Sequence, residues 1–499
     1  MNKRQLGLMI GALLLSGCSM APDYDVPTVA MNDVYLNQVD SATQPGSHFH
    51  AAWWEAFQDA QLNRLVSDAQ RQNITLKIAS ERIQAAQSYH KAVASLKVPT
   101  VSISGGVADI RLSENEAMMG GMVRDHTLPS ALGGGQVRVM DRDQTDYFLG
   151  LNASWELDVF GRIDSMSQAA AIRAEQAAIM KQAVTTLITA DVINNYLQYR
   201  GAQERIAIAD ENIRDQEEML RLVESLNRHG YGSELDVANA KANLAATRAM
   251  VPKLETAKSV HLNRLAILLG ENLHKTEARL AGQSAQRVMP SMHGVIPTGL
   301  PSELLTRRPD IALAEREIAA RNQEVGAAIA NQYPRFFLTG SPGVMAGDFG
   351  DLFDSGSDTW MLGAGFSWNI FDAGRNKAMV DMQEAGFRQS VLSYQDTVNA
   401  AFNEVETALR AYGNSQQFEH YLKEAEQQAE TALGKANSLY QSGLVNHLSV
   451  LDAQRQKNQV QDAEVLARLN TASSVVMLHK ALGGDWNSPA ARLPSVPRT

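Results

Sequence analysis

The sequence predicts an α+β membrane protein whose two halves are copies of one motif, with four β-strands joined to very long helices. The segment WELDVFGR at 155–162 recurs as WNIFDAGR at 368–375, an offset of 213 residues. The segment LNRHG at 226–230 recurs as LYQSG at 439–443 with the same offset, and the helix ahead of the strands recurs at an offset of 235. Such self-similarity marks a duplicated architecture. Each half is therefore expected to run helix, strand, loop, strand, long helix, turn, returning helix.

The N-terminus predicts secretion and a lipid anchor. Residues 1–17 carry a charged start and an apolar run too short to span a bilayer, so we expect a cleaved signal peptide. The run ends in LSGC, the pattern of bacterial lipoproteins, which predicts lipidation of Cys18, with palmitate among the acyl chains. The next residue is Ser19 rather than an aspartate, and this favours the outer membrane. The residues that follow, 18–60, are irregular.

Composition excludes several classes of function. A net charge of −10 with interspersed signs argues against a nucleic-acid partner, and the single cysteine forms no intrachain disulfide. The histidines show no metal-ligand spacing, and no P-loop, G-x-S-x-G or H-E-x-x-H motif occurs, so we expect no enzyme, metal site or cofactor. Met118, Met119 and Met122 indicate a flexible exposed loop rather than a soft-metal site. No later stretch approaches 18 apolar residues, so any membrane crossing must use strands.

The first repeat, residues 61–270, alternates helical and strand patterns. Pro99 ends the first helical pattern, and period-2 alternation before Trp155 is typical of a lipid-facing barrel strand with tryptophan at the membrane interface. The long helix that follows contains no proline and one glycine, and at 1.5 Å per residue it is about 100 Å long. The expected elements are a helix at 61–96, strands at about 99–110 and 146–160 separated by a loop at 111–145, a long helix at 162–229 and a return helix at 233–268.

The second repeat, residues 301–482, follows a linker at 271–300 and precedes a tail at 483–499. Trp360 and Trp368 are the expected interface aromatics of this half. Small residues at heptad-like spacing on the long helices predict coiled-coil packing. The expected elements are a helix at 302–332, strands at about 334–342 and 359–371, a long helix at 375–441 and a return helix at 446–481.

The number of strands predicts an oligomer. Four strands cannot close a barrel, and open sheet edges are not tolerated in lipid. Two chains give eight strands, whose interior is nearly filled by side chains. Three chains give twelve, the smallest count that suits a conducting tube, so we expect a trimer.

Six segments together resemble one family, the TolC-type outer-membrane factors, in their lipidated drug-efflux branch (NodT/OprM-like). They are LSGC at 15–18, WWEAFQDAQLNRLV at 53–66, LLTRRPDI at 304–311, SWNIFDAGR at 367–375, LYQSGLVNHLSVLDAQ at 439–454 and ALGGDW at 481–486.

This resemblance implies a homotrimer in the outer membrane of a Gram-negative bacterium. It implies a twelve-stranded barrel, a long α-helical periplasmic barrel and a mixed equatorial collar formed by residues 18–60, 271–300 and 483–499. It further implies docking to a periplasmic adaptor and to an inner-membrane pump, commonly of the RND class.

Glycine-containing turns are expected at the periplasmic tips, where such a tube closes. Glycine permits the left-handed backbone that a tight helix reversal needs. We expect Gly230, Gly232, Gly443 and Val445 to form the tip turns and to contact the adaptor.

Three side chains near these turns are candidates for the gate. Asp236 and Asp452 would each form a ring of three like charges in a trimer, which attracts cations at the narrowest point. Ser233-x-x-Asp236 is also a capping-box pattern, so capping alone remains an alternative for this aspartate. Tyr440 is either a latch or a packing residue.

The function that follows is an outer-membrane exit channel of a tripartite efflux pump, which passively conducts drugs or other small toxic compounds. One alternative is the outer-membrane duct of a type I protein-secretion system. Another is a lipid-anchored periplasmic coiled-coil scaffold or adaptor, which predicts a monomer without strands at 147–158 and 360–371.

Overall fold

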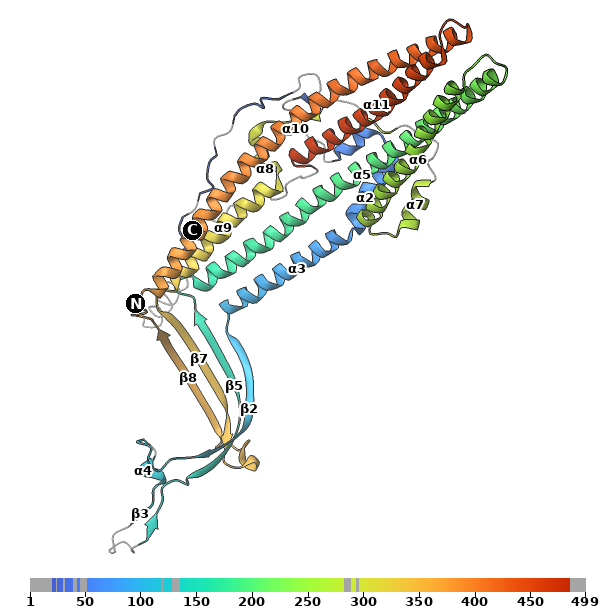
Figure 1. Ribbon diagram of the computed structural model, residues 1–499. Helices are drawn as coiled ribbons and strands as arrows, with labels where there is room; N and C mark the ends of the chain where they lie inside the picture. The colour runs from blue at the N-terminus through green and yellow to red at the C-terminus, as the bar shows by residue number, and fades with distance from the viewer. Residues whose placement is uncertain are drawn as a thin grey trace. The chain divides into compact units, whose positions relative to one another are not determined.

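The computed structural model of the 499-residue chain describes residues 20–23, 25–29, 32–38, 43–44, 52–118, 120–127, 135–281, 289–292 and 296–484 (Figure 1). The signal peptide, Cys18, Met119 and most of the tail at 483–499 lie outside these residues. The chain forms two compact units, and each unit takes segments from both repeats. The first contains residues 86–173 and 319–389, and the second contains residues 174–318 and 390–499 together with 26–85.

The first unit holds one antiparallel sheet of four strands in the order β2-β5-β7-β8 (Figure 1). The pairing of β5 with β7 joins the two repeats and leaves β2 and β8 at the edges. β7 is longer than the expected 334–342 because its ladders with β5 and β8 continue beyond Pro342. β8 ends earlier than expected, so residues 368–371 are not strand. The strands are β2 (Thr100–Arg111), β5 (Asp143–Leu157), β7 (Arg335–Ala346) and β8 (Asp358–Ser367).

The two faces of this sheet differ in polarity. One face is apolar and exposed along its length, with Val101, Ile103, Leu338, Leu362 and Phe366 among its side chains. On the other face, the amide of Asn152 donates to Ser104 Oγ at 2.6 Å and accepts from Ser341 Oγ at 2.8 Å. Alternation along β7 places Thr339, Phe337 and Arg335 on the same polar face as Ser341.

The segment expected as a plain loop at 111–145 carries structure of its own. It contains α4 (Gly120–Val123) and a short hairpin of β3 (His126–Thr127) and β4 (Gln136–Val137). The sequence prediction missed this hairpin because two-residue strands give no periodic signal.

The long helices are α5 (Arg162–Arg228), α6 (Glu234–Leu269), α10 (Arg375–Gln441) and α11 (His447–Ala481). α5 and α10 have 67 residues each. In the described part of the chain, no helix is both long and apolar enough to span a bilayer.

The first helix of each repeat is divided, although one continuous helix was expected. Residues 61–96 form α2 (Ala60–Gln72) and α3 (Ile74–Ala94), and the break at Asn73 is held by its side-chain amide, which donates to the carbonyl of Leu268 at 2.7 Å. Residues 302–332 form η4 (Pro301–Glu303), α8 (Leu304–Arg307) and α9 (Pro309–Ala330). Here Arg308 is extended because it precedes a proline.

The duplication extends to individual hydrogen bonds. The indole of Trp155 donates to the carbonyl of Lys97 at 3.0 Å, and the indole of Trp368 donates to the carbonyl of Gln332 at 2.9 Å. The donors lie 213 residues apart and the acceptors 235, the two offsets found in the sequence. Both tryptophans are therefore held at equivalent strand ends.

The two adjacent tryptophans near the N-terminus are part of the core of the second unit. They lie in η1 (Trp53–Phe57), and Trp53 stacks on His479 of α11 with ring centroids 4.2 Å apart. His479 is fully buried, and this burial lowers its pKa to about 3. The imidazole is therefore neutral in the folded protein.

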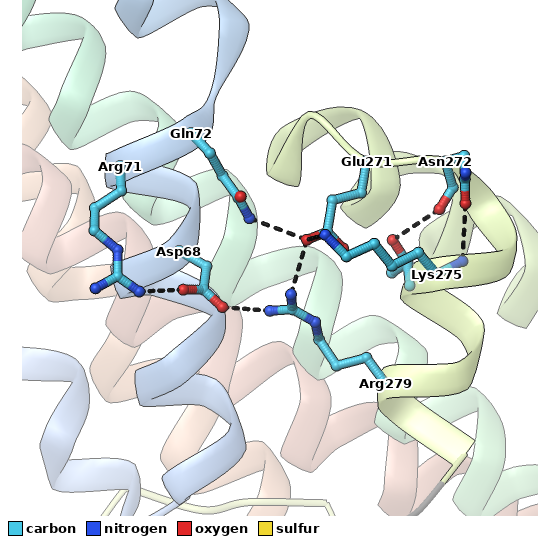
Figure 2. A network of polar contacts seen from close by, with 8 residues as sticks. Asp68, Arg71, Gln72, Glu271, Asn272, Lys275 and Arg279 are labelled. Atoms are coloured by element: carbon cyan, nitrogen blue, oxygen red, sulfur yellow. Dashed lines mark hydrogen bonds and ion pairs between the residues drawn. The ribbon is translucent and has the colours of Figure 1, made fainter.

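A polar network fixes the linker at 271–300 to the second unit (Figure 2). The linker contains α7 (Leu273–Ala281) and β6 (Ile296–Pro297), and β6 pairs in parallel with β1 (Thr43–Gln44). Arg279 bridges Asp68 of α2 and Glu271, with 2.8 Å to the latter, and Gln72 donates to the same glutamate at 3.1 Å. The expected N-terminal and linker parts of the collar therefore meet in one unit.

Candidate gate at the tips of the long helices

Each pair of long helices reverses through a turn that requires glycine. Gly230 and Gly443 have φ values of 82° and 72°. The amide of Tyr231 donates to the carbonyl of Leu226, and that of Leu444 donates to the carbonyl of Leu439, both at 2.9 Å. These are the hydrogen bonds of a glycine-ended helix. Gly232 is not left-handed, but a Cβ there would lie 3.1 Å from the backbone nitrogen of Asn227, a tight contact that a small shift of the backbone would have to relieve.

Asp236 closes a capping box at the start of α6. The amide of Asp236 donates to Ser233 Oγ at 3.1 Å, while its carboxylate accepts from the Ser233 hydroxyl at 2.7 Å and from the Ser233 amide at 3.3 Å. In the second repeat, Asn446 caps α11 by accepting from the amide of Ser449 at 3.2 Å. The capping interpretation of Asp236 is confirmed, and a role in the pore remains a prediction.

The second oxygen of this carboxylate faces a buried histidine on the other hairpin. Asp236 Oδ1 lies 3.9 Å from Nδ1 of His447, whose side chain is 3 % exposed. That nitrogen has no hydrogen-bond partner among the described residues. Burial lowers the pKa of His447, and the nearby Asp236 offsets part of this effect. The imidazole is therefore held in its neutral form.

Tyr440 packs against His447 within the second hairpin. Its ring lies 5.8 Å from that of His447, at an interplanar angle of 57°. Burial, and then the charge of Asp236, raise the pKa of the Tyr440 phenol. The cluster of Asp236, His447 and Tyr440, here called the tip cluster, links the start of α6 to the end of α10 and the start of α11.

Asp452 is not part of the tip cluster. It lies on α11 with an exposed side chain, and among the described residues it has no hydrogen bond or ion pair. Its neighbour Leu451 is buried instead. Within one chain, the two predicted aspartates are therefore not brought together.

Sequence reasoning missed His447. It is the first residue of α11 and aligns with Glu234 of the first repeat, so the duplication itself gave no signal for it. The residue type was a usable signal. A histidine at the start of a helix can titrate near neutral pH, so it was a candidate for the site whether exposed or buried.

The predicted interface aromatics lie toward opposite ends of the sheet. Trp155 and Trp368 lie at the end next to the helices, and Trp360 lies near the far end of β8 and is 71 % exposed. Trp360 and Trp368 are eight residues apart, which corresponds to about 26 Å of extended chain.

A four-stranded sheet whose strands lead into 67-residue helices, reversed at glycine turns, is the subunit fold of the TolC-like outer-membrane channels. The solved structure of the outer-membrane channel OprN matches it with a TM-score of 0.83 at 31 % identity, covering 94 % of this chain and 99 % of that one. A structure of CusC matches with a TM-score of 0.77 at 26 % identity, covering 94 % of this chain and all of that one.

A family model described as outer membrane efflux protein matches residues 65–271 and 300–484, so the chain belongs to that family. The chain is 32 % identical to outer membrane protein OprJ of Pseudomonas aeruginosa, over 98 % of this chain and 97 % of that one. It is 30 % identical to the solvent efflux pump outer membrane protein SrpC of Pseudomonas putida, over 96 % and 98 % of the two chains.

Membership of this family gives the function at a coarse level. The protein is the outer-membrane channel of a tripartite efflux pump, it extends into the periplasm, and it is not an enzyme.

Proposed function

We propose that three copies of the chain close a twelve-stranded barrel and conduct small toxic compounds passively to the exterior. The observation that carries this proposal is the sheet, which has one apolar face, one polar face and two edge strands, β2 and β8, whose outer edges pair with no strand among the described residues. In lipid, such edges must pair with other chains. The extended chain between Trp360 and Trp368 is about 26 Å long, and at a strand tilt of about 35–45° it spans roughly 20 Å along the membrane normal, within an apolar band of about 25 Å.

Family membership supports the partners and the cargo that we propose. A periplasmic adaptor would meet the turns at Gly230, Gly232, Gly443 and Val445, and an inner-membrane pump of the RND class would supply the energy. Relatives are named for the efflux of solvents, of antibiotics and of cations. Small organic compounds are the cargo class we propose here, with Cys18 lipidated as a second attachment to the membrane.

The tip cluster would hold the periplasmic end closed. His447, against which Tyr440 packs within the second hairpin, faces Asp236 of the first hairpin, and Asp236 and Asp452 would present carboxylates near the constriction. A passive channel needs such a closure because an open tube would abolish the permeability barrier of the outer membrane.

The scaffold alternative is contradicted by the structure. It predicted no strands at 147–158 and 360–371, and these residues lie largely in β5 and β8. The secretion-duct alternative uses a similar architecture and needs a functional test.

Deletion of the gene tests the proposal in cells. We expect increased sensitivity to a panel of dyes, antibiotics, solvents and detergents, restored by the wild-type gene. Loss of a secreted protein with unchanged sensitivity would favour the secretion duct instead.

A further inference from the structure

The duplication leaves one arginine without the carboxylate that its counterpart has. In the first repeat, Arg162 is held by Glu156, with its Nη2 at 2.9 and 2.8 Å from the two carboxylate oxygens. The equivalent arginine, 213 residues later, is Arg375, and the position of the glutamate is taken by Asn369. Among the described residues, the guanidinium of Arg375 has no hydrogen bond or ion pair. The guanidinium charge is therefore neutralised by a carboxylate at Arg162 and has no such partner among the described residues at Arg375.

Arg375 lines a pocket of about 620 Å³ between α9, β7, the end of β8 and the start of α10. Arg335 lines the same pocket; it donates to Asn331 Oδ1 at 2.7 Å and has no carboxylate partner among the described residues. Its equivalent in the first repeat, at the offset of 235, is the neutral Thr100. Arg335 is thus particular to the second repeat, whereas Arg375 differs from its counterpart Arg162 only in lacking a carboxylate partner among the described residues.

The single acidic side chain of the pocket wall does not neutralise them. Glu324 accepts from Arg173 at 3.1 Å and from Arg321 at 2.9 Å. The pocket therefore keeps an excess of positive charge in a protein whose net charge is −10. The remaining wall is mixed: it includes four side-chain amides and three larger apolar surfaces, from Asn331, Asn369, Asn376, Gln383, Tyr333, Phe337 and Met379.

The pocket opens on the polar face of the sheet. Arg335 and Phe337 alternate on β7 with the apolar-face residues, and Ser367 pairs with Arg335 from β8. On α9, the opposite side of the helix is covered by the chain start, where Asn322 donates to the carbonyl of Pro22 at 2.8 Å. In a closed barrel with its apolar face toward lipid, the pocket therefore faces the water-filled interior.

From these contacts we infer that the pocket binds the acidic group of a small organic solute, a carboxylate or sulfonate, through Arg375 and Arg335. A planar guanidinium recognises such a group with two parallel hydrogen bonds. The aromatic and thioether side chains accommodate an apolar body beside it. The inference rests on the proposed channel, because the interior location depends on barrel closure. A phospholipid phosphate shares this chemistry, but its acyl chains need the apolar face on the other side of the sheet.

The test is a binding titration on the purified, detergent-solubilised full-length protein, with 2-naphthoate as the probe and neutral 2-naphthamide as its control. We expect naphthoate to bind more tightly than the amide. Arg375→Gln and Arg335→Gln should each weaken naphthoate binding by about 10-fold or more, the effect of losing one charge-assisted hydrogen-bonding group.

The decisive variant leaves both arginines in place. Asn369→Glu restores to the second repeat the carboxylate that the first repeat has, and it should pair with Arg375 and abolish naphthoate binding. The matched control is Arg388→Gln, an exposed arginine of the same helix outside the pocket, paired with Glu384 at 3.5 Å. It should bind as the wild type does.

Equal binding of the amide, or unchanged naphthoate binding in Asn369→Glu, overturns the inference. Binding of phosphatidylglycerol in mixed micelles without binding of naphthoate would place a lipid phosphate in the pocket and would also overturn it. The titration does not require conduction. A wild type that conducts in a bilayer but binds no naphthoate would contradict the binding site and would not contradict the channel.

Discussion

At the residue scale, the proposed gate consists of side chains that differ between the two repeats. His447 aligns with Glu234, Tyr440 with Asn227, and Asp236 with Ser449. The tip cluster is one of the places where the two repeats differ, and the pocket at Arg375 is another.

The neutral state of His447 predicts a pH response. Burial lowers its pKa below the ordinary value of 6.5, so in the proposed gate an open tip with an exposed His447 takes up a proton before the closed tip does. The closed arrangement is then most stable above pH 6.5 and loses stability as the pH falls through the lowered pKa. We expect the single-channel conductance to rise on acidification from neutral pH, and His447→Phe to remove most of this rise. An equal rise in the variant would contradict the assignment.

Two substitutions separate the capping role of Asp236 from a role in the pore. Asp236→Asn keeps an acceptor oxygen for Ser233 and removes the charge, whereas Asp236→Ala removes both. If the carboxylate lines the pore, both variants lose cation selectivity, and the alanine variant also loses about 0.5–2 kcal/mol of local helix stability. Reversal potentials in a salt gradient measure the selectivity. Unchanged potentials in the asparagine variant would leave Asp236 as a cap alone.

At the element scale, the sequence predicted the long helices well and their irregularities poorly. The absence of proline made α5 and α10 predictable, and Pro252 did not interrupt α6. The break at Asn73 was not predictable, since no proline or glycine marks it and its cause is a tertiary hydrogen bond to Leu268. The hairpin of β3 and β4 and the buried position of His447 likewise depend on contacts distant in sequence.

The turn glycines give a prediction with an internal control. Gly443→Ala places a Cβ at a φ of 72° and should cost about 1–2 kcal/mol, although no atom lies within 4 Å of that Cβ. Gly434→Ala, within α10 and equally free of contacts, should instead stabilise the helix by about 1 kcal/mol. Hydrogen exchange near the tip measures both. Equal effects of the two substitutions would contradict the role of the left-handed backbone.

The contact between η1 and α11 predicts a second pH effect, distinct from the gate. The pKa of His479 is lowered to about 3, so the unfolded chain binds the extra proton between pH 6.5 and about 3. Stability should therefore fall as the pH decreases through this window. His479→Phe, which keeps a ring against Trp53, should flatten the dependence of the thermal midpoint on pH. A slope equal to that of the wild type would show that other groups cause it.

At the scale of the whole molecule, we propose that the outer edges of β2 and β8 pair between three chains to form one tube. Light scattering of the detergent-solubilised protein should give three times the mass of the chain, and a monomeric mass would contradict it.

Planar-bilayer conductance of the purified trimer tests the claim most directly, with the wild type, Asp236→Ala/Asp452→Ala, and Tyr440→Ala/His447→Ala compared under the same conditions. We predict small, cation-selective currents from the wild type, reduced selectivity in the aspartate variant and larger currents when the tip cluster is removed. A folded trimer that carries no current, even without the tip cluster, would contradict the account.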